Sequence, residues 1–225
     1  MNYVYKIQNL NKSFSDRNIL TNINMEIQKG DMVSITGESG SGKSTLLNIM
    51  GLLDKPSSGN ISFMGKNITK STMYQRKLIL RDKIAYLFQN FALIDNETIS
   101  QNLDICLIYS KLKKNEKEIL KKEALKKVGI ELPLNSKIFT LSGGEQQRVA
   151  IARILLRNYE VILADEPTGS LDENSKHDII HILKELNKQG KTIIIVTHDE
   201  YVSSQCNKRF KLINGNLQEE ISIAK

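Results

Sequence analysis

The sequence predicts an α/β protein with a central parallel sheet, antiparallel strands near the N-terminus and an inserted helical region. Two short aliphatic runs, Val161 to Ala164 and Thr192 to Val196, are typical of strands buried on both faces of a parallel sheet. A helix is expected between them, from about Asn174 to Lys188, with Gly190 after its end. One face of this helix carries its apolar residues, Ile179, Ile180, Leu183 and Leu186. Strand, helix and strand together form a βαβ unit.

The elements of the N-terminal part follow from shorter patterns. Tyr3 to Leu10 and Ile23 to Ile27 alternate apolar and polar residues, which predicts antiparallel strands with one solvent-exposed face. Met32 to Thr36 predicts a strand that leads into a glycine-rich turn, and a helix follows from Lys43 to Met50. Two further strand-like runs are Ala85 to Phe88 and Arg209 to Ile213.

The inserted region runs from about Asn96 to Tyr159 and has helical patterns throughout, including a charged helix over Lys111 to Lys127 that Gly129 closes. We therefore expect residues 1–95 and 160–225 to form the core with its antiparallel part, and residues 96–159 to form a helical subdomain. The whole chain is expected to be one such domain.

The composition is that of a soluble globular protein, with 225 residues, 40% hydrophobic and 25% charged. The longest aliphatic run, Ile193 to Val196, is too short to span a bilayer, and the N-terminus lacks the features of a secretion signal, so a cytosolic protein is expected. Cys106 and Cys206 have no metal-like spacing. The net charge of +7 is compatible with an acidic partner such as nucleotide, lipid or nucleic acid, but it favours solvated lysine-rich helices such as Lys111 to Lys127.

The glycine-rich turn fits the phosphate-loop pattern G-x-x-x-x-G-K-[ST], between a predicted strand and a predicted helix. Glycines let backbone N–H groups wrap phosphates, the lysine reaches the β and γ oxygens, and the following serine supplies an oxygen to Mg²⁺. The pattern predicts a P-loop NTPase core of the RecA-like type. The nucleotide-binding residues expected here are Gly37, Glu38, Ser39, Gly40, Ser41, Gly42, Lys43, Ser44 and Thr45.

Two acids follow the strand Val161 to Ala164, at the sheet edge where open α/β sheets bind ligands. Asp165 suits the holding of Mg²⁺, and Glu166 suits the general base for an attacking water. Adjacent acids at a strand end are also often only solvated. The phosphate loop on the same edge favours the catalytic interpretation.

Three further residues are candidates by position. His198 ends the next buried strand and should emerge beside Glu166, where it could contact the γ-phosphate, although a histidine after a strand is commonly structural. Gln89 follows a strand-like run and could touch both the metal and the attacking water. Phe14 could stack on a nucleotide base.

The octet Leu-Ser-Gly-Gly-Glu-Gln-Gln-Arg, residues 141–148, is the most informative run of the chain. Ser142 and Glu145 have the spacing of a helix capping box, expected to precede a helix from Gln146 to Arg157. A capping box does not require the two glycines between them. Gly143 and Gly144 would let a phosphate approach backbone N–H groups at the positive end of the helix dipole, with Ser142 as an additional donor.

Together these motifs resemble the nucleotide-binding subunit of ABC transporters, in the family's order and along essentially the whole chain. The resemblance implies ATP and Mg²⁺ as cofactors, with Ser44, Gln89 and Asp165 at the metal and Lys43, Glu166, Gln89 and His198 in catalysis. It also implies that two copies pair head to tail, so that Ser142, Gly143 and Gly144 serve the ATP of the opposite subunit and Asp172 crosses the interface.

Three segments are similar to the lipoprotein-release and macrolide-exporter branch, which also contains antimicrobial-peptide (bacteriocin) export systems: Gly51 to Gly59, Phe88 to Leu93 and Ala164 to Gly169. This resemblance implies an ATPase that energises a separate membrane permease for export of a peptide, lipid-linked or hydrophobic substrate. Its location would be the inner face of the cell membrane, held there by the permease.

The chain departs from the branch at Asp95 and Gln101, where proline and glutamate are usual, and at Phe14, where tyrosine is commoner. The first two lie beside the groove expected to receive the permease. One alternative remains open, in which the ATPase regulates a transmembrane signalling or cell-wall enzyme complex without moving cargo. A role on nucleic acid is not expected, because the chain carries one cassette and no long coiled coil.

Overall fold

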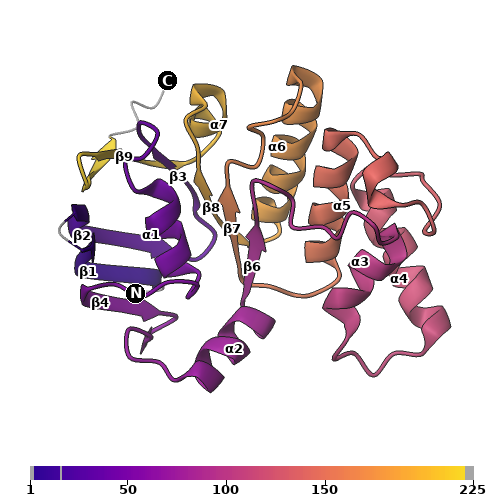
Figure 1. The fold of residues 1–225 in the computed structure, drawn as a ribbon, viewed down its shortest axis with the longest axis horizontal. Coiled ribbons are helices and arrows are strands. Elements are labelled where there is room, and N and C mark those ends of the chain that lie inside the picture. Colours follow the sequence, from indigo (N-terminus) through magenta and orange to yellow (C-terminus); the bar gives the residue numbers. More distant parts are fainter. Residues whose placement is uncertain (1–2, 16, 221–225) are drawn as a thin grey trace.

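The computed structural model describes residues 3–15 and 17–220 and contains two sheets flanked by helices (Figure 1). The strands are β1 Tyr3–Phe14, β2 Arg17–Gln28, β3 Met32–Thr36, β4 Ser58–Phe63, β5 Lys66–Asn67, β6 Ile84–Leu87, β7 Val161–Asp165, β8 Thr192–Val196, β9 Lys208–Ile213 and β10 Asn216–Glu220. The α-helices are α1 Lys43–Met50, α2 Met73–Asp82, α3 Ile99–Asp104, α4 Lys114–Lys127, α5 Gly143–Leu155, α6 Glu173–Lys188 and α7 Glu200–Ser204. Short 3₁₀ turns cover Ile105–Leu107 and Ile138–Thr140.

The larger sheet has the strand order β10-β9-β3-β8-β7-β6, and its strands from β9 to β6 are parallel. The predicted βαβ unit is present, since β7 pairs in parallel with β8 and α6 connects them. The smaller, antiparallel sheet has the order β2-β1-β4-β5. The expected α/β class, with an antiparallel part and a helical insertion, is therefore confirmed.

Alternation along the central strands places a hydrophobic core on each face of the larger sheet. Ile162, Ile193 and Ile195 pack into one core with the apolar sides of α5 and α6. Leu163 and Ile194 pack into the other core with α1 and the antiparallel sheet. The sheet is thereby fixed from both sides, so the ends of its strands form a rigid edge.

Several elements differ from the sequence-based expectation. The charged helix begins at Lys114, not Lys111, because Lys113 is its N-cap and its N–H is bound by the Glu116 carboxylate. The helix after the octet begins at Gly143, not Gln146, because the Ser142 cap starts it at the glycines. Five elements were not expected, namely β4, β5, β10, α2 and α7.

None of the helices that the structure describes has the length and apolar character needed to cross a membrane.

Candidate functional site

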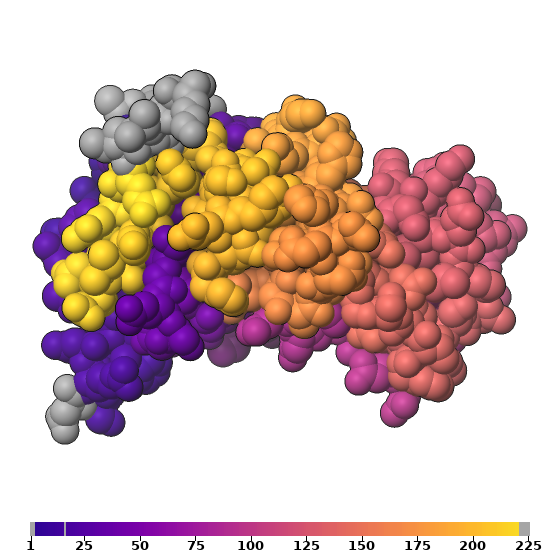
Figure 2. All heavy atoms as spheres, turned by 90° about the horizontal axis from the view of Figure 1, so that it is seen from above, coloured from indigo at the N-terminus to yellow at the C-terminus, as the bar shows by residue number. Residues whose placement is uncertain are grey.

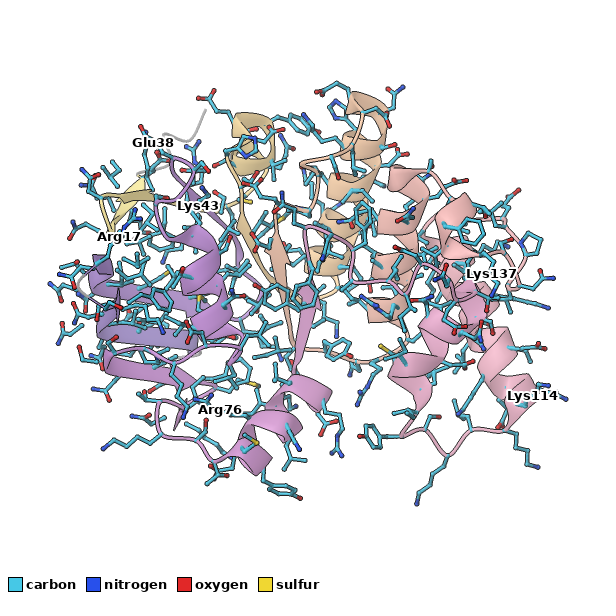
Figure 3. All side chains as sticks on the ribbon, viewed as in Figure 1. Arg17, Glu38, Lys43, Arg76, Lys114 and Lys137 are labelled. Atoms are coloured by element: carbon cyan, nitrogen blue, oxygen red, sulfur yellow. The ribbon has the colours of Figure 1, made fainter. Side chains whose placement is uncertain are left out.

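The phosphate loop connects β3 to α1 at the carboxyl edge of the parallel sheet, where Figure 3 places Glu38 and Lys43. Gly42 has a φ of +105°, and a Cβ there would lie 3.0 Å from the Ile19 side chain. A side chain at Gly37 would collide with the Leu212 carbonyl oxygen. The glycines are thus required by the fold of the loop as well as by a phosphate.

The side chain of Lys43 is held inside this loop by backbone carbonyl groups. Its side chain is buried, and Nζ donates hydrogen bonds to the carbonyl oxygens of Gly37 at 2.8 Å and Glu38 at 2.9 Å. Because an ammonium group has three donors, one remains for a phosphate oxygen.

The loop lines an open cavity of about 540 Å³ that also contains Gln89, Glu166 and His198. These three residues come from the ends of β6, β7 and β8, which are neighbours in the sheet. A second cavity, of about 640 Å³, lies against Gly37 to Ser41 from the side of β9 and the turn that follows it, and is lined by Arg17 and Lys211 among others. Only the first cavity brings the predicted catalytic residues together with the loop. Figure 2 looks onto this edge and shows the C-terminal segments, yellow and orange, across its middle.

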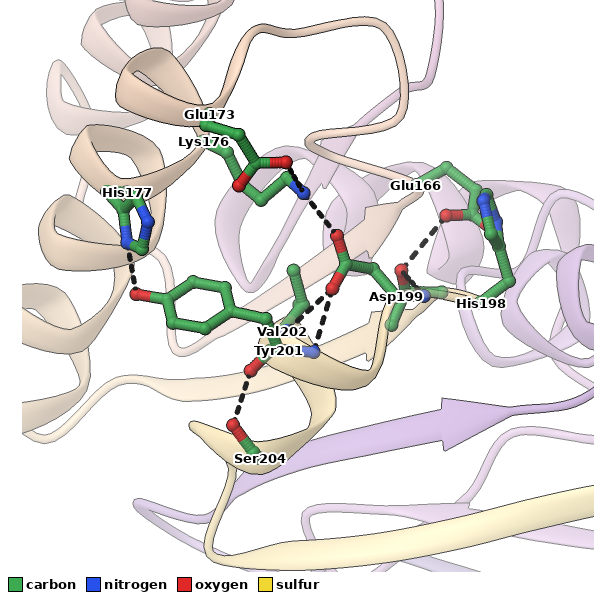
Figure 4. Close-up of polar contacts among 10 residues, drawn as sticks. Glu166, Glu173, Lys176, His177, His198, Asp199, Tyr201, Val202 and Ser204 are labelled. Atoms are coloured by element: carbon green, nitrogen blue, oxygen red, sulfur yellow. Dashed lines mark hydrogen bonds and ion pairs between the residues drawn. The ribbon is translucent and has the colours of Figure 1, made fainter.

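Glu166 has a φ of +44°, which is uncommon for a residue other than glycine. Its N–H donates to the Val196 carbonyl oxygen at 2.9 Å. Oε2 accepts from Thr197 Oγ1 at 3.0 Å, and Oε1 lies 2.9 Å from His198 Nδ1 (Figure 4). The Glu166 side chain is only 12% exposed, whereas that of His198 is 72% exposed. The carboxylate is therefore fixed, and the imidazole is accessible to a ligand.

Ser44 lines the cavity and Asp165 lies beside it, with Ser44 Oγ donating to Asp165 Oδ1 at 3.0 Å. Burial raises the pKa of Asp165 and the neighbouring Glu166 charge adds to this, while the Ser44 hydrogen bond acts in the opposite direction. Among the described residues no three His, Cys, Asp or Glu side chains gather around one point. A hydroxyl and one carboxylate nevertheless fit Mg²⁺, which is usually held by few protein oxygens together with water and substrate phosphates.

Ser142 caps α5, and the capping box is complete. Its N–H donates to Glu145 Oε2 at 2.8 Å, and its Oγ accepts from the Glu145 N–H at 3.3 Å. The hydrogen bonds from Ser142 lower the pKa of Glu145. Ser142 and Gly143 are exposed and do not line the cavity of their own chain. Their neighbours are the β7–α6 loop and the start of α6, where a Cβ at Gly144 would lie 2.6 Å from Ser175 Oγ.

Two other predicted residues, Asp172 and Phe14, also lie away from the cavity. Asp172 is exposed and caps α6, its Oδ1 accepting from the Ser175 N–H at 3.0 Å, and hydrogen bonds from Ser175 lower its pKa. Phe14 is half exposed at the end of β1, with Lys12 Nζ 4.4 Å from its ring centroid. Base stacking on Phe14 remains a prediction.

A polar network behind His198 was not expected from the sequence (Figure 4). Lys176 on α6 pairs with Asp199 at 2.7 Å, and Asp199 caps α7. His177 Nδ1 lies 2.6 Å from the Tyr201 hydroxyl. The run Thr197-His198-Asp199 before a short helix offered a signal for the cap, but the partner on α6 depends on tertiary packing.

Comparison with known proteins identifies this architecture. A family model described as ABC transporter matches residues 20–169. An uncharacterized ABC transporter ATP-binding protein of Bacillus subtilis (strain 168), YvrO, is 41% identical over 94% of this chain and 94% of its own length. The macrolide export ATP-binding/permease protein MacB of Mannheimia succiniciproducens is 38% identical over 96% of this chain and 34% of its own length. The chain thus spans about a third of the MacB relatives.

Comparison with solved structures leads to the same family. The dimeric structure of MJ0796, described as a bacterial ABC transporter cassette, superposes with a TM-score of 0.90 and 38% identity, covering 98% of this chain and 100% of that one. A second structure of the same cassette, a post-hydrolysis state bound to ADP and Pi, superposes equally well. The resemblance drawn from the motifs is confirmed: the chain belongs to the ABC transporter family and is an ABC-type, ATP-binding ATPase.

Proposed function

We propose that this chain is the ATP-hydrolysing subunit of a transporter whose permease is a separate chain, and that it drives export of a peptide, lipid-linked or hydrophobic substrate. The observation that carries the proposal is the cavity in which the phosphate loop, Glu166 and His198 converge, with the octet outside it. One chain therefore supplies one catalytic half and one signature half, at two different places.

The residues of the cavity have distinct roles in this proposal. The loop amides and Lys43 hold the phosphates, and Thr45 adds a hydroxyl donor. Glu166 accepts the proton of the attacking water, and the exposed His198 contacts the γ-phosphate. Ser44, Gln89 and Asp165 would hold Mg²⁺, which when bound neutralises charge on the phosphates.

Two copies pair head to tail, and the signature of each copy closes over the nucleotide of the other. The exposed position of Ser142 and Gly143, away from their own cavity, supports this arrangement. The dimeric structures of MJ0796 are consistent with it. Asp172, exposed at the start of α6, would lie at the interface.

A permease in a separate chain is supported by the relative YvrO, which this chain matches over 94% of that protein's length. The MacB relatives, named ATP-binding/permease proteins for macrolide export, support export as the direction of transport. Attachment to the inner face of the membrane would then depend on the permease.

The catalytic part is tested by Glu166→Gln, which should retain ATP binding and slow hydrolysis by roughly 10²- to 10⁴-fold, the usual contribution of a general base. With Mg²⁺ and ATP the variant should accumulate as a dimer in size-exclusion chromatography. Lys43→Ala is the control, because it should fail to bind ATP and stay monomeric. Wild-type turnover by Glu166→Gln would remove Glu166 from the mechanism.

The transport part is tested by flotation with liposomes that contain a candidate permease, chosen from the open reading frames next to the gene of this chain. The subunit should float only with permease-containing liposomes. Equal flotation with protein-free liposomes would contradict attachment through a permease. ATP-dependent uptake of cargo into inverted vesicles would support export. Its absence would favour the alternative, in which ATP hydrolysis regulates a transmembrane complex and no cargo is moved.

A further inference from the structure

Gln147 is a buried polar side chain in α5, outside the nucleotide cavity. Its exposed fraction is 0%, and its Nε2 donates to the Pro167 carbonyl oxygen at 2.7 Å. Because a carbonyl only accepts, this contact fixes the orientation of the amide. Among the described residues, no donor lies within hydrogen-bond distance of Oε1.

The two ends of this hydrogen bond belong to different halves of the machinery. Gly144, three residues before Gln147, lies on the same face of α5, and that face packs against the start of α6 at Ser175. Pro167 directly follows Glu166 in the β7–α6 loop. A single hydrogen bond therefore joins the signature helix to the backbone beside the catalytic carboxylate.

The backbone at this point needs external support. The positive φ of Glu166 is unfavourable for its residue type and persists only where the surroundings fix it. The N-terminal side is held by the bond from the Glu166 N–H to Val196. Pro167 has no N–H, so its carbonyl oxygen is its only backbone hydrogen-bonding group. Gln147 holds that group from another element.

We propose that Gln147 is a positioning residue that couples the signature helix to Glu166 of the same chain. When α5 moves to close over the partner's ATP, the hydrogen bond to Pro167 carries that movement to the catalytic base. ATP capture at one site thereby sets the geometry of hydrolysis at the other. The inference rests on the proposed function, since it takes Glu166 as the base and the octet as a contact to the second subunit.

The variant Gln147→Met tests whether Gln147 positions Glu166 or only stabilises the fold. Methionine has a similar length and is apolar, so it fills the site but donates no hydrogen bond. The wild type leaves the Oε1 acceptor unsatisfied, and the variant leaves the Pro167 carbonyl unsatisfied instead. One buried acceptor is unsatisfied in both proteins, so their stabilities should be similar.

The variant should lower kcat on the order of 10²-fold, the effect of a misplacement of about 1 Å in a catalytic group. The KM for ATP and the midpoint of thermal unfolding should stay close to wild type. Asn187→Leu is the matched control. The Asn187 amide donates to the carbonyls of Gly30 and Lys191, both at 2.8 Å, near the end of α6. This control should lower stability and spare kcat. An unchanged kcat in Gln147→Met, or a parallel loss of stability and ATP binding, would overturn the proposal.

Single-turnover rates in the Glu166→Gln background test whether Gln147 acts through Glu166. The double variant should hydrolyse ATP as slowly as Glu166→Gln alone, because effects through one group do not add. A further fall in the residual rate would contradict positioning of Glu166. Should Glu166→Gln itself keep the wild-type rate, the proposed catalytic base is wrong. Should it be slow while Gln147→Met is fast, only the coupling is wrong.

Discussion

Gly143 occupies a helical position at which alanine should be more stable than glycine. A Cβ added there would lie 3.7 Å from Leu171 Cδ2 and 3.9 Å from the Ser170 carbonyl oxygen, both ordinary van der Waals distances. Gly→Ala at a compatible site stabilises by about 0.4–1 kcal/mol, chiefly by restricting the unfolded chain. For a chain of this size that raises the melting midpoint by about 1–4 °C.

The same methyl group should damage catalysis. In the proposed dimer Gly143 presents its backbone N–H to the partner's phosphates, and a side chain would hold them away. Loss of such a donor costs on the order of 10²-fold in rate. Differential scanning calorimetry of the ligand-free protein and single-turnover hydrolysis by the dimer measure the two effects. Gly144→Ala is the comparison: its Cβ would lie 2.6 Å from Ser175 Oγ, so it should lack the gain in stability. A destabilised Gly143→Ala, or one with wild-type turnover, would refute the reasoning.

Three further predictions concern stability. Burial raises the pKa of Asp165 in the folded protein above its ordinary value of 3.8, so the stability of the ligand-free protein falls as the pH rises from 3.8 through the raised pKa. Asp165→Asn removes this unfavourable charge and should therefore have a higher melting midpoint than wild type at pH 7. The same variant should lose the Mg²⁺-dependent stabilisation by ATP. Burial acts to raise the pKa of Asp199, but the hydrogen bond and charge of Lys176, together with hydrogen bonds from the backbone N–H groups of Val202 and Tyr201, outweigh it, and the net pKa is lowered. The Lys176–Asp199 pair therefore stabilises the fold fully above pH 3.8 and not below the lowered value. Lys176→Met should accordingly be less stable than wild type in urea at pH 7, and the difference should shrink toward pH 3. Leu183→Ala should cost about 2–5 kcal/mol in free energy of unfolding, since Leu183 is fully buried.

The core of the fold was predictable because its elements carry strong local patterns. The runs at Val161 and Thr192 are aliphatic throughout, and α6 has a clear apolar face. By contrast, no residue of α2 is buried, so no helical period appears in its sequence. β10 is an edge strand of largely polar residues, and nothing in its composition separates it from a loop.

The site was predictable where a motif encodes its own geometry. The phosphate loop is such a case, since its glycines are required by its turns. The support of Glu166 by Thr197 and of Asp199 by Lys176 joins residues from different elements. The sequence around Gln147 does not indicate its role, because tertiary packing decides which face of α5 contacts Pro167.

The central claim, that the octet serves the ATP of the opposite subunit, is tested most directly by complementation. Lys43→Ala disables the phosphate loop, and Gly143→Asp disables the signature while an acid in the first turn suits the helix dipole. Each variant alone should be inactive in single-turnover hydrolysis. In the mixed dimer, the intact loop of one subunit faces the intact signature of the other, so mixing should restore one active site. If the octet completed the site of its own chain, every site in the mixture would carry a defect, and hydrolysis would stay absent.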